Sequence, residues 1–184
     1  EVRKSISLFI SNLNWSLFNL LFICFYQMGL IFLFSLPILA AWQGSENAIN
    51  YSDYIISFLM LLFIITETIA DQQQYNFQSE KYRRLRNGEN LEGMYKDGFI
   101  SNGLWAYSRH PNFASEQLIW ITFYMFSVSA TGLILNWSII GCVLLVILFF
   151  NSAKFSEEIS SKKYSKYADY QKSVPMFLGI VKKK

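Results

Sequence analysis

Four polar side chains recur one helical turn apart at the end of an otherwise apolar run. Glu67, Asp71, Gln74 and Gln78 are separated by four, three and four residues, so on a helix they project from one face. Apolar residues reach directly up to Glu67, and an acidic side chain in such surroundings is costly without a partner or water. The pattern favours a polar wall that faces an internal ligand site. A helix end that emerges into water is the alternative.

A second polar group lies where another helix is expected to begin. Pro111 suits the first position of a helix, because its missing N–H would have no partner there. Arg109 and His110 therefore precede a helix N-terminus, where exposed amides favour an anion, and a guanidinium suits phosphate or carboxylate. Asn112 and Glu116 follow one turn apart. We interpret this group as part of an anion-binding site; an arginine that reaches lipid phosphate is the alternative.

The elements that would position these groups are long apolar helices. Only 16% of the 184 residues are charged, against roughly 25% in soluble domains. Since about 20 apolar residues cross a bilayer, we expect transmembrane helices over about 15–42, 54–78, 112–130 and 133–152. Residues 127–132 are typical of a tight turn, which would join the last two helices as a hairpin. The expected fold is an all-α polytopic membrane protein, a single domain with four transmembrane helices.

Two polar segments flank these helices. Residues 79–110 are rich in Arg, Asn and Gly and form the only connection large enough to cover a ligand. The tail over about 153–178 contains Glu158 and then, from Tyr164 onward, three tyrosines spaced three residues apart, which lie along one face of a helix. Such a helix lies on the membrane surface or closes over a cofactor, and both readings stay open.

All lysines and arginines fall on one side of the membrane if the helices alternate in direction. The connections 43–53 and 127–132 contain none of them. By the positive-inside rule the basic side, with both chain ends, is the cytoplasm or the mitochondrial matrix; endoplasmic reticulum, mitochondrial inner and bacterial inner membranes all remain open. The sixteen residues are Arg3, Lys4, Lys81, Arg83, Arg84, Arg86, Lys96, Arg109, Lys154, Lys162, Lys163, Lys166, Lys172, Lys182, Lys183 and Lys184.

The composition argues against several classes of site. One histidine in the whole chain excludes a His-rich metal site, and Cys24 and Cys142 lie inside apolar runs, where cysteine behaves as a small apolar residue. We therefore expect no metal. The net charge of +3 is small, and the expected partners are lipids and an apolar small molecule rather than nucleic acid.

Three motifs occur in order: Ala70-Asp71-Gln72-Gln73-Gln74…Phe77, then Gly103-Leu104-Trp105…Ser108-Arg109-His110-Pro111-Asn112-Phe113…Glu116…Trp120, then Glu157-Glu158…Lys163-Tyr164…Tyr167…Tyr170…Val174-Pro175. Together they resemble the steroid 5-alpha-reductase-like membrane reductases, above all their poorly characterised branch. The resemblance covers about residues 15–178. It implies a multi-helix membrane fold with NADPH in a cytosol-facing cavity, and reduction of a carbon–carbon double bond conjugated to a ketone.

The same resemblance implies roles for individual residues. Glu67, Asp71 and Gln78 would line the cofactor cavity, with Gln78 standing where the steroid reductases have arginine. The remaining predicted cofactor-binding residues are Gln74 and His110 beside these motifs, Arg109 at the neighbouring anion position, Asn112 and Glu116 on the family's Asn-x-x-x-Glu, and Glu158 and Tyr164 in the closing tail.

Two departures from the family pattern bear on activity. Ser115 stands where the family usually has glycine. Family members also have helices before the equivalent of Trp15, with the residues that polarise the substrate ketone, so we expect N-terminal helices to be missing here and leave the catalytic residues unassigned. The substrate class would be a steroid, sterol or polyprenyl-like enone.

Two other functions remain open. Membrane methyltransferases of the isoprenylcysteine carboxyl type share an Arg-His-Pro motif, a downstream glutamate and a Tyr-x-x-Tyr tail, and they bind S-adenosylmethionine. The aromatic, lipid-suited surface is also consistent with a catalytically silent subunit of a larger membrane assembly.

Overall fold

The computed structural model describes residues 15–44, 48–179 and 181, and all the regular secondary structure in these residues is helical. Expectations for Arg3, Lys4 and Lys182–Lys184 lie outside these residues. The elements are α2 (Trp15–Phe18), the π-helix η1 (Asn19–Tyr26), α3 (Gln27–Gln43), α4 (Tyr51–Arg86), α5 (Gly93–Asp97), the 3₁₀-helix η2 (Gly103–Ala106), α6 (Pro111–Thr131), α7 (Ile139–Lys163) and α8 (Tyr167–Ser173).

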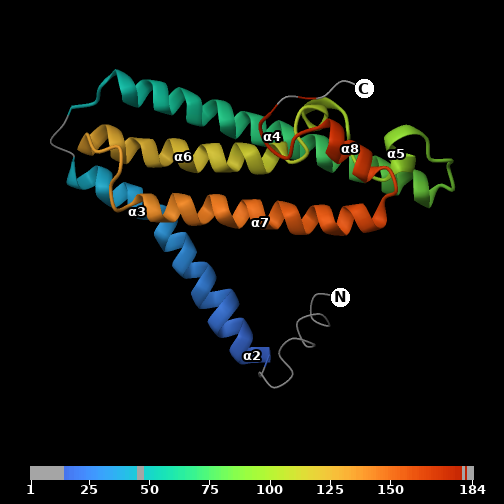
Figure 1. The fold of residues 1–184 in the computed structure, drawn as a ribbon, viewed down its shortest axis with the longest axis horizontal. Helices are drawn as coiled ribbons and strands as arrows, with labels where there is room; N and C mark the ends of the chain where they lie inside the picture. Colours follow the sequence, from blue (N-terminus) through green and yellow to red (C-terminus); the bar gives the residue numbers. More distant parts are fainter. Residues whose placement is uncertain (1–14, 45–47, 180, 182–184) are drawn as a thin grey trace.

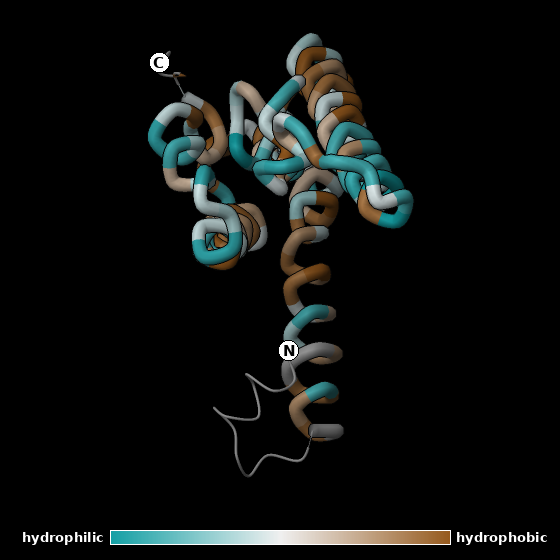
Figure 2. The backbone as a smooth tube through the Cα atoms, turned by 90° about the vertical axis from the view of Figure 1, so that its right-hand side faces the viewer, coloured by the Kyte–Doolittle hydropathy of each residue, from teal (hydrophilic) through white to brown (hydrophobic). Residues whose placement is uncertain are grey.

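Three long helices, α4, α6 and α7, run side by side (Figure 1). Helix α6 packs against α4 on one side and against α3 and α7 on the other. The α2 end of the first helical run stands apart from the other helices in both views (Figures 1 and 2). The α5 and α8 segments gather at one end of the bundle, and the C-terminal end of α3, the start of α4 and the connection 132–138 lie at the other (Figure 1).

Within the described residues, three helical stretches are long and apolar enough to cross a membrane, one fewer than the four expected. They are Asn19–Gln43, Tyr51–Arg86 and Ile139–Lys163. The expected fourth, α6, has 21 residues but carries Asn112, Ser115, Glu116 and Gln117 in its first two turns. These polar groups face partner helices rather than adding apolar surface, which is why α6 falls short on composition.

Helix α4 is longer than expected, since it continues to Arg86 rather than ending at residue 78. Glu80 pairs with Arg83 and Arg84, three and four residues on, and pairs at these spacings stabilise a helix. The expected loop 79–110 therefore starts eight residues later, and it contains α5 and η2.

The turn expected at residues 127–132 is instead helical as far as Thr131. The hydroxyl of Ser127 donates a hydrogen bond to the carbonyl of Tyr124, a local bond that serine makes inside helices. Gly132 then ends α6 with a φ of 70°, the left-handed conformation that glycine adopts at helix C-termini. The connection is 132–138, and α7 extends to Lys163, so the expected tail helix over 153–178 shrinks to α8.

Helices α3 and α7 approach each other closely at Gly141. A β-carbon at this position would clash with the carbonyl group of Leu33 on α3. Small residues permit such backbone contact between membrane helices, where packing rather than the hydrophobic effect holds helices together. Gly29, earlier on α3, has no atom within 4 Å of the corresponding position.

We predict that Gly141→Leu separates α3 from α7 and destabilises the protein by about 1–3 kcal/mol, the usual cost of overpacking. The thermal unfolding midpoint of the detergent-solubilised chain measures the effect. Gly29→Leu is the matched control and should leave the midpoint nearly unchanged. Equal effects of the two substitutions would contradict the close α3–α7 contact.

Candidate functional site

A cavity of about 270 Å³ lies at the α8 end of the bundle. Helix α4 contributes Gln74 and Gln78 to its wall, and α6 contributes Asn112. The segment from Gly98 to His110, Ser156 and Ser160 of α7, and the tyrosines of the tail complete the wall. The volume is just below the range of about 300–1,000 Å³ that is typical of ligand pockets. A cavity of this size has room for one part of an extended ligand rather than for the whole of it.

The acidic residues of the two predicted groups meet where α4 and α6 pack together. The side-chain amide of Asn112 donates to Asp71 at 3.0 Å, and the carboxyl groups of Glu67 and Glu116 face each other. Each pair of residues is four apart on its own helix, so antiparallel packing makes two contacts one turn apart. Trp120 also donates to Glu116 at 2.9 Å. These contacts join the two predicted groups, with Glu67, Asp71 and Glu116 beside rather than in the cavity wall.

Two buried oxygen atoms of the cavity wall accept no hydrogen bond in the described part of the chain. They are Oε1 of Gln74 and Oδ1 of Asn112. The assignment of Oδ1 is secure because the amide nitrogen of Asn112 already donates to a carboxylate, which accepts hydrogen bonds. A buried acceptor without a donor costs about 1–3 kcal/mol. Both atoms are therefore unpaired acceptors on residues that line the cavity.

Three consecutive glutamines on α4 have three different environments. Gln72 is exposed and donates to Asn76 at 2.7 Å. Gln73 accepts from the backbone N–H of Leu104 at 3.0 Å and so holds η2 against α4. Gln74 lies in the cavity wall. Since successive helical residues point about 100° apart, one tripeptide contacts solvent, a loop and the cavity.

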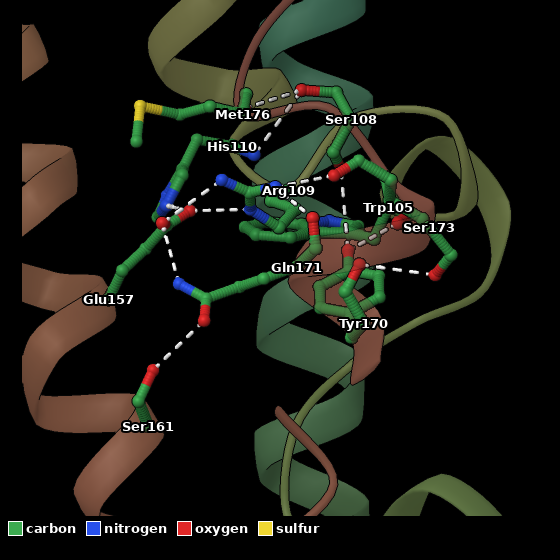
Figure 3. A network of polar contacts seen from close by, with 11 residues as sticks. Trp105, Ser108, Arg109, His110, Glu157, Ser161, Tyr170, Gln171, Ser173 and Met176 are labelled. Atoms are coloured by element: carbon green, nitrogen blue, oxygen red, sulfur yellow. Dashed lines mark hydrogen bonds and ion pairs between the residues drawn. The ribbon is translucent and has the colours of Figure 1, made fainter. Parts of the chain in front are cut away.

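Arg109 is buried at the centre of a polar network (Figure 3). Its guanidinium donates to the two carboxylate oxygens of Glu157 at 2.6 and 3.0 Å, and to the carbonyls of Gln171 and Val174. These four bonds use four of the five N–H groups of an arginine. Arg109, which was expected to bind the anion of a ligand, is bound here to a carboxylate of this chain.

The same network fastens the tail over the end of the bundle. His110 Nε2 lies 3.1 Å from Glu157 Oε1, and Gln171 donates to the other oxygen of Glu157 at 2.9 Å. The backbone N–H groups of Arg109 and His110 donate to the carbonyls of Pro175 and Met176 at 2.9 and 3.0 Å. Residues 171–176 are therefore held against the start of α6, and α8 forms one wall of the cavity.

Tyr167 and Tyr170 of α8 line this wall and are buried. Burial raises the pKa of Tyr167 to about 12 and also raises the pKa of Tyr170, because the interior disfavours a phenolate. Both hydroxyls therefore keep their protons at neutral pH. Tyr170 donates its proton to the carbonyl of Trp105, which ties α8 to η2.

The structure separates the predicted cofactor residues into groups. Gln74, Gln78, Arg109, His110, Asn112 and Tyr164 line the cavity. Glu158 is exposed and does not line this cavity, and its neighbour Glu157 is the carboxylate that enters the network. Glu157 belongs to the tail motif of the sequence, but no role was predicted for it. It lies one turn after Ala153, and both are buried on the same face of α7.

Residues 6–174 match a family described as "Protein of unknown function (DUF1295)". The chain belongs to the DUF1295 family. This family is associated with steroid 5-alpha-reductase-like proteins, so the motif resemblance is supported at that level. A relative from the fission yeast Schizosaccharomyces pombe, an uncharacterised protein, is 34% identical over 175 residues, which cover 89% of this chain and 49% of the relative. The chain therefore spans about half the length of the curated relative that it matches. No solved structure matches the chain.

We predict that Arg109→Met and Glu157→Met each destabilise the fold by about 3–5 kcal/mol, since each leaves a buried charge without its partner. The double variant should lose less than the sum, by a coupling of about 1–3 kcal/mol. Denaturant unfolding in mixed micelles measures all three. Lys172→Met, which breaks the exposed pair with Asp169, is the control and should change stability much less. Strict additivity of the two single variants would contradict the buried pair.

Proposed function

We propose that this chain binds NADPH in the cavity between α4, α6 and the tail. In the full-length protein, the bound nucleotide would reduce a carbon–carbon double bond of an apolar enone, such as a steroid, sterol or polyprenyl-like ketone. The observation that carries the proposal is the pair of buried acceptors without donors, Gln74 Oε1 and Asn112 Oδ1. The class of reaction is proposed from the motif resemblance.

The ligand must offer hydrogen-bond donors to these two oxygens. NADPH has such donors in the carboxamide N–H groups of its nicotinamide and in its ribose hydroxyls. Of the polar residues that α4 and α6 contribute to the cavity wall, Gln74 and Asn112 are nearest the apolar middle of their helices. The nicotinamide end of the nucleotide is therefore placed beside them. Hydride transfer to an apolar substrate requires this end of the nucleotide to lie toward the membrane.

Hydride addition to the distal carbon of an enone places negative charge on the ketone oxygen. A hydrogen-bond donor fixed against that oxygen is therefore required, and the loss of one such donor typically costs about 2.7–4 kcal/mol in activation free energy. We assign no residue of this chain to that role. The proposal is that this chain supplies nucleotide binding and that turnover requires the full-length protein.

The proposal includes a membrane topology in which α6 is a fourth spanning helix. Helix α6 lies between α3, α4 and α7, so its polar first turns are covered by protein rather than by lipid, as intramembrane polar groups require. No Lys or Arg occurs among the described residues between α3 and α4, which are 44 and 48–50, or in the connection 132–138 between α6 and α7. The α5 and α8 end would then be the cytoplasmic or matrix side.

We predict that cysteines placed at Leu135 and Ser165, in a chain with Cys24 and Cys142 replaced by alanine, react with membrane-impermeant maleimide from opposite sides. Both positions are exposed, and they lie at opposite ends of the bundle. Labelling of intact and of permeabilised vesicles separates the two sides. Reaction of both cysteines from the same side would contradict the four-helix topology.

Gln74→Met tests the central observation, because it replaces an acceptor without a donor by an apolar group of similar length. We predict that it leaves the unliganded protein equally or more stable and weakens NADPH binding about fivefold, the effect of losing a hydrogen bond worth about 1 kcal/mol. Calorimetric titration and thermal unfolding measure the two quantities.

Gln72→Met, at the exposed position, is the matched control and should change neither quantity. Gln73→Met should destabilise the protein by removing the bond to Leu104. Titration with S-adenosylmethionine runs in parallel. Binding of S-adenosylmethionine in place of NADPH would overturn the reductase proposal in favour of a methyltransferase, and binding of neither would favour a non-enzymatic subunit.

A further inference from the structure

The polar stripe on α4 continues beyond the predicted group to Lys81. Asp71, Gln74, Gln78 and Lys81 follow one another at spacings of three, four and three, so they share one face of the helix. At a rise of 1.5 Å per residue, the stripe is about 15 Å long. Lys81 Nζ donates to the carbonyl of Gly98 at 2.9 Å, and Gly98 lines the cavity. The stripe therefore runs from the acceptors at its membrane end to a lysine at the aqueous rim.

Two lysines flank one aromatic ring at this rim. Lys81 Nζ lies 5.3 Å and Lys163 Nζ lies 5.2 Å from the ring centre of Tyr164, which itself lines the cavity. The ring packs directly against Gly98, where a β-carbon would clash with Tyr164. Lysines from α4 and from the end of α7, 82 residues apart in the chain, thus converge on one part of the cavity rim.

The charges of these two lysines are not neutralised by the protein. Within the described residues, neither Lys81 nor Lys163 forms an ion pair with a carboxylate, whereas Arg83, Arg84, Lys166 and Lys172 do. Asp97, the acidic residue next to Gly98, is paired with Lys166 at 2.8 Å. Arg109, the arginine of the cavity wall, is bound to Glu157. The rim at Tyr164 therefore offers positive charge to an anion from outside the chain.

We propose that Lys81 and Lys163 bind the 2′-phosphate of NADPH beside Tyr164, and so select NADPH over NADH. This inference rests on the proposed function. With the nicotinamide at Gln74 and Asn112, the opposite end of the extended nucleotide reaches the rim, and that end carries the 2′-phosphate. The phosphate ligand is then this lysine pair rather than Arg109.

The test is calorimetric titration of the purified chain with NADPH and with NADH. Lys81→Gln and Lys163→Gln should each lower the preference for NADPH by about threefold to tenfold, the effect of a charged hydrogen bond weakened by solvent. The double variant should abolish most of the preference. Arginine at both positions should retain it, and added salt should reduce it in the wild type.

Lys154→Gln is the matched control. It removes the same charge from a lysine that lies 4.7 Å from the ring centre of Phe150, outside the cavity wall. Unchanged unfolding midpoints confirm that all variants are folded. Preference for NADPH that survives both glutamine substitutions, or that falls equally in Lys154→Gln, overturns the lysine pair and leaves nucleotide binding intact. Absence of any nicotinamide nucleotide binding to the wild type overturns the proposed function as well.

A lipid phosphate has the same chemistry as the nucleotide phosphate and is distinguished by a second arm. Titration of the detergent-solubilised chain with soluble short-chain phosphatidylserine reports headgroup binding. The inference requires that the two glutamine substitutions change nucleotide preference and leave phosphatidylserine binding nearly as it was. Loss of phosphatidylserine binding without a change in nucleotide preference would assign the lysines to lipid and overturn the inference.

Discussion

The buried pair of Arg109 with Glu157 is the interaction on which the cavity depends. One guanidinium joins α7 to the carbonyls of Gln171 and Val174, and the adjoining backbone holds Pro175 and Met176. Removing one partner of a buried ion pair costs several kcal/mol, so the two charges stabilise the tail only as a pair. Together with the bond from Tyr170 to the carbonyl of Trp105, they hold the wall made by Tyr164, Tyr167 and Tyr170.

The rigid wall fixes the positions of polar groups that have no hydrogen-bond partner. In a mobile site, Gln74 and Asn112 would turn toward other partners, but Asn112 is held by Asp71 and Gln74 projects from the middle of a long helix. Their oxygens are therefore preorganised acceptors, which lower the stability of the empty protein and favour a ligand that brings donors. The two lysines at the rim have the complementary property of unneutralised positive charge. A ligand with donors at one end and a phosphate at the other satisfies both.

Much of the helical framework could be predicted from the sequence, because apolar runs longer than a bilayer is thick allow few other structures. The contact of α4 with α6 was also accessible, since Glu67 with Asp71 and Asn112 with Glu116 repeat at the same spacing. The partner of Arg109 was not. Glu157 and Glu158 are adjacent and chemically identical, and only the packing of α7 decides which of them is buried. The end of α6 could not be predicted, because Ser127 and Thr131 are residue types that are common in turns. Here their hydroxyls donate to carbonyls of their own helix.

A cryo-EM structure of the full-length protein with NADPH would test the account most directly. The account predicts nucleotide density in the cavity between α4, α6 and the tail, with donors of the nicotinamide end within hydrogen-bonding distance of Gln74 Oε1 and Asn112 Oδ1. The pair of Arg109 with Glu157 should remain unbroken. A cavity filled by lipid or by S-adenosylmethionine, or a nucleotide whose phosphate displaces Glu157 from Arg109, would contradict it.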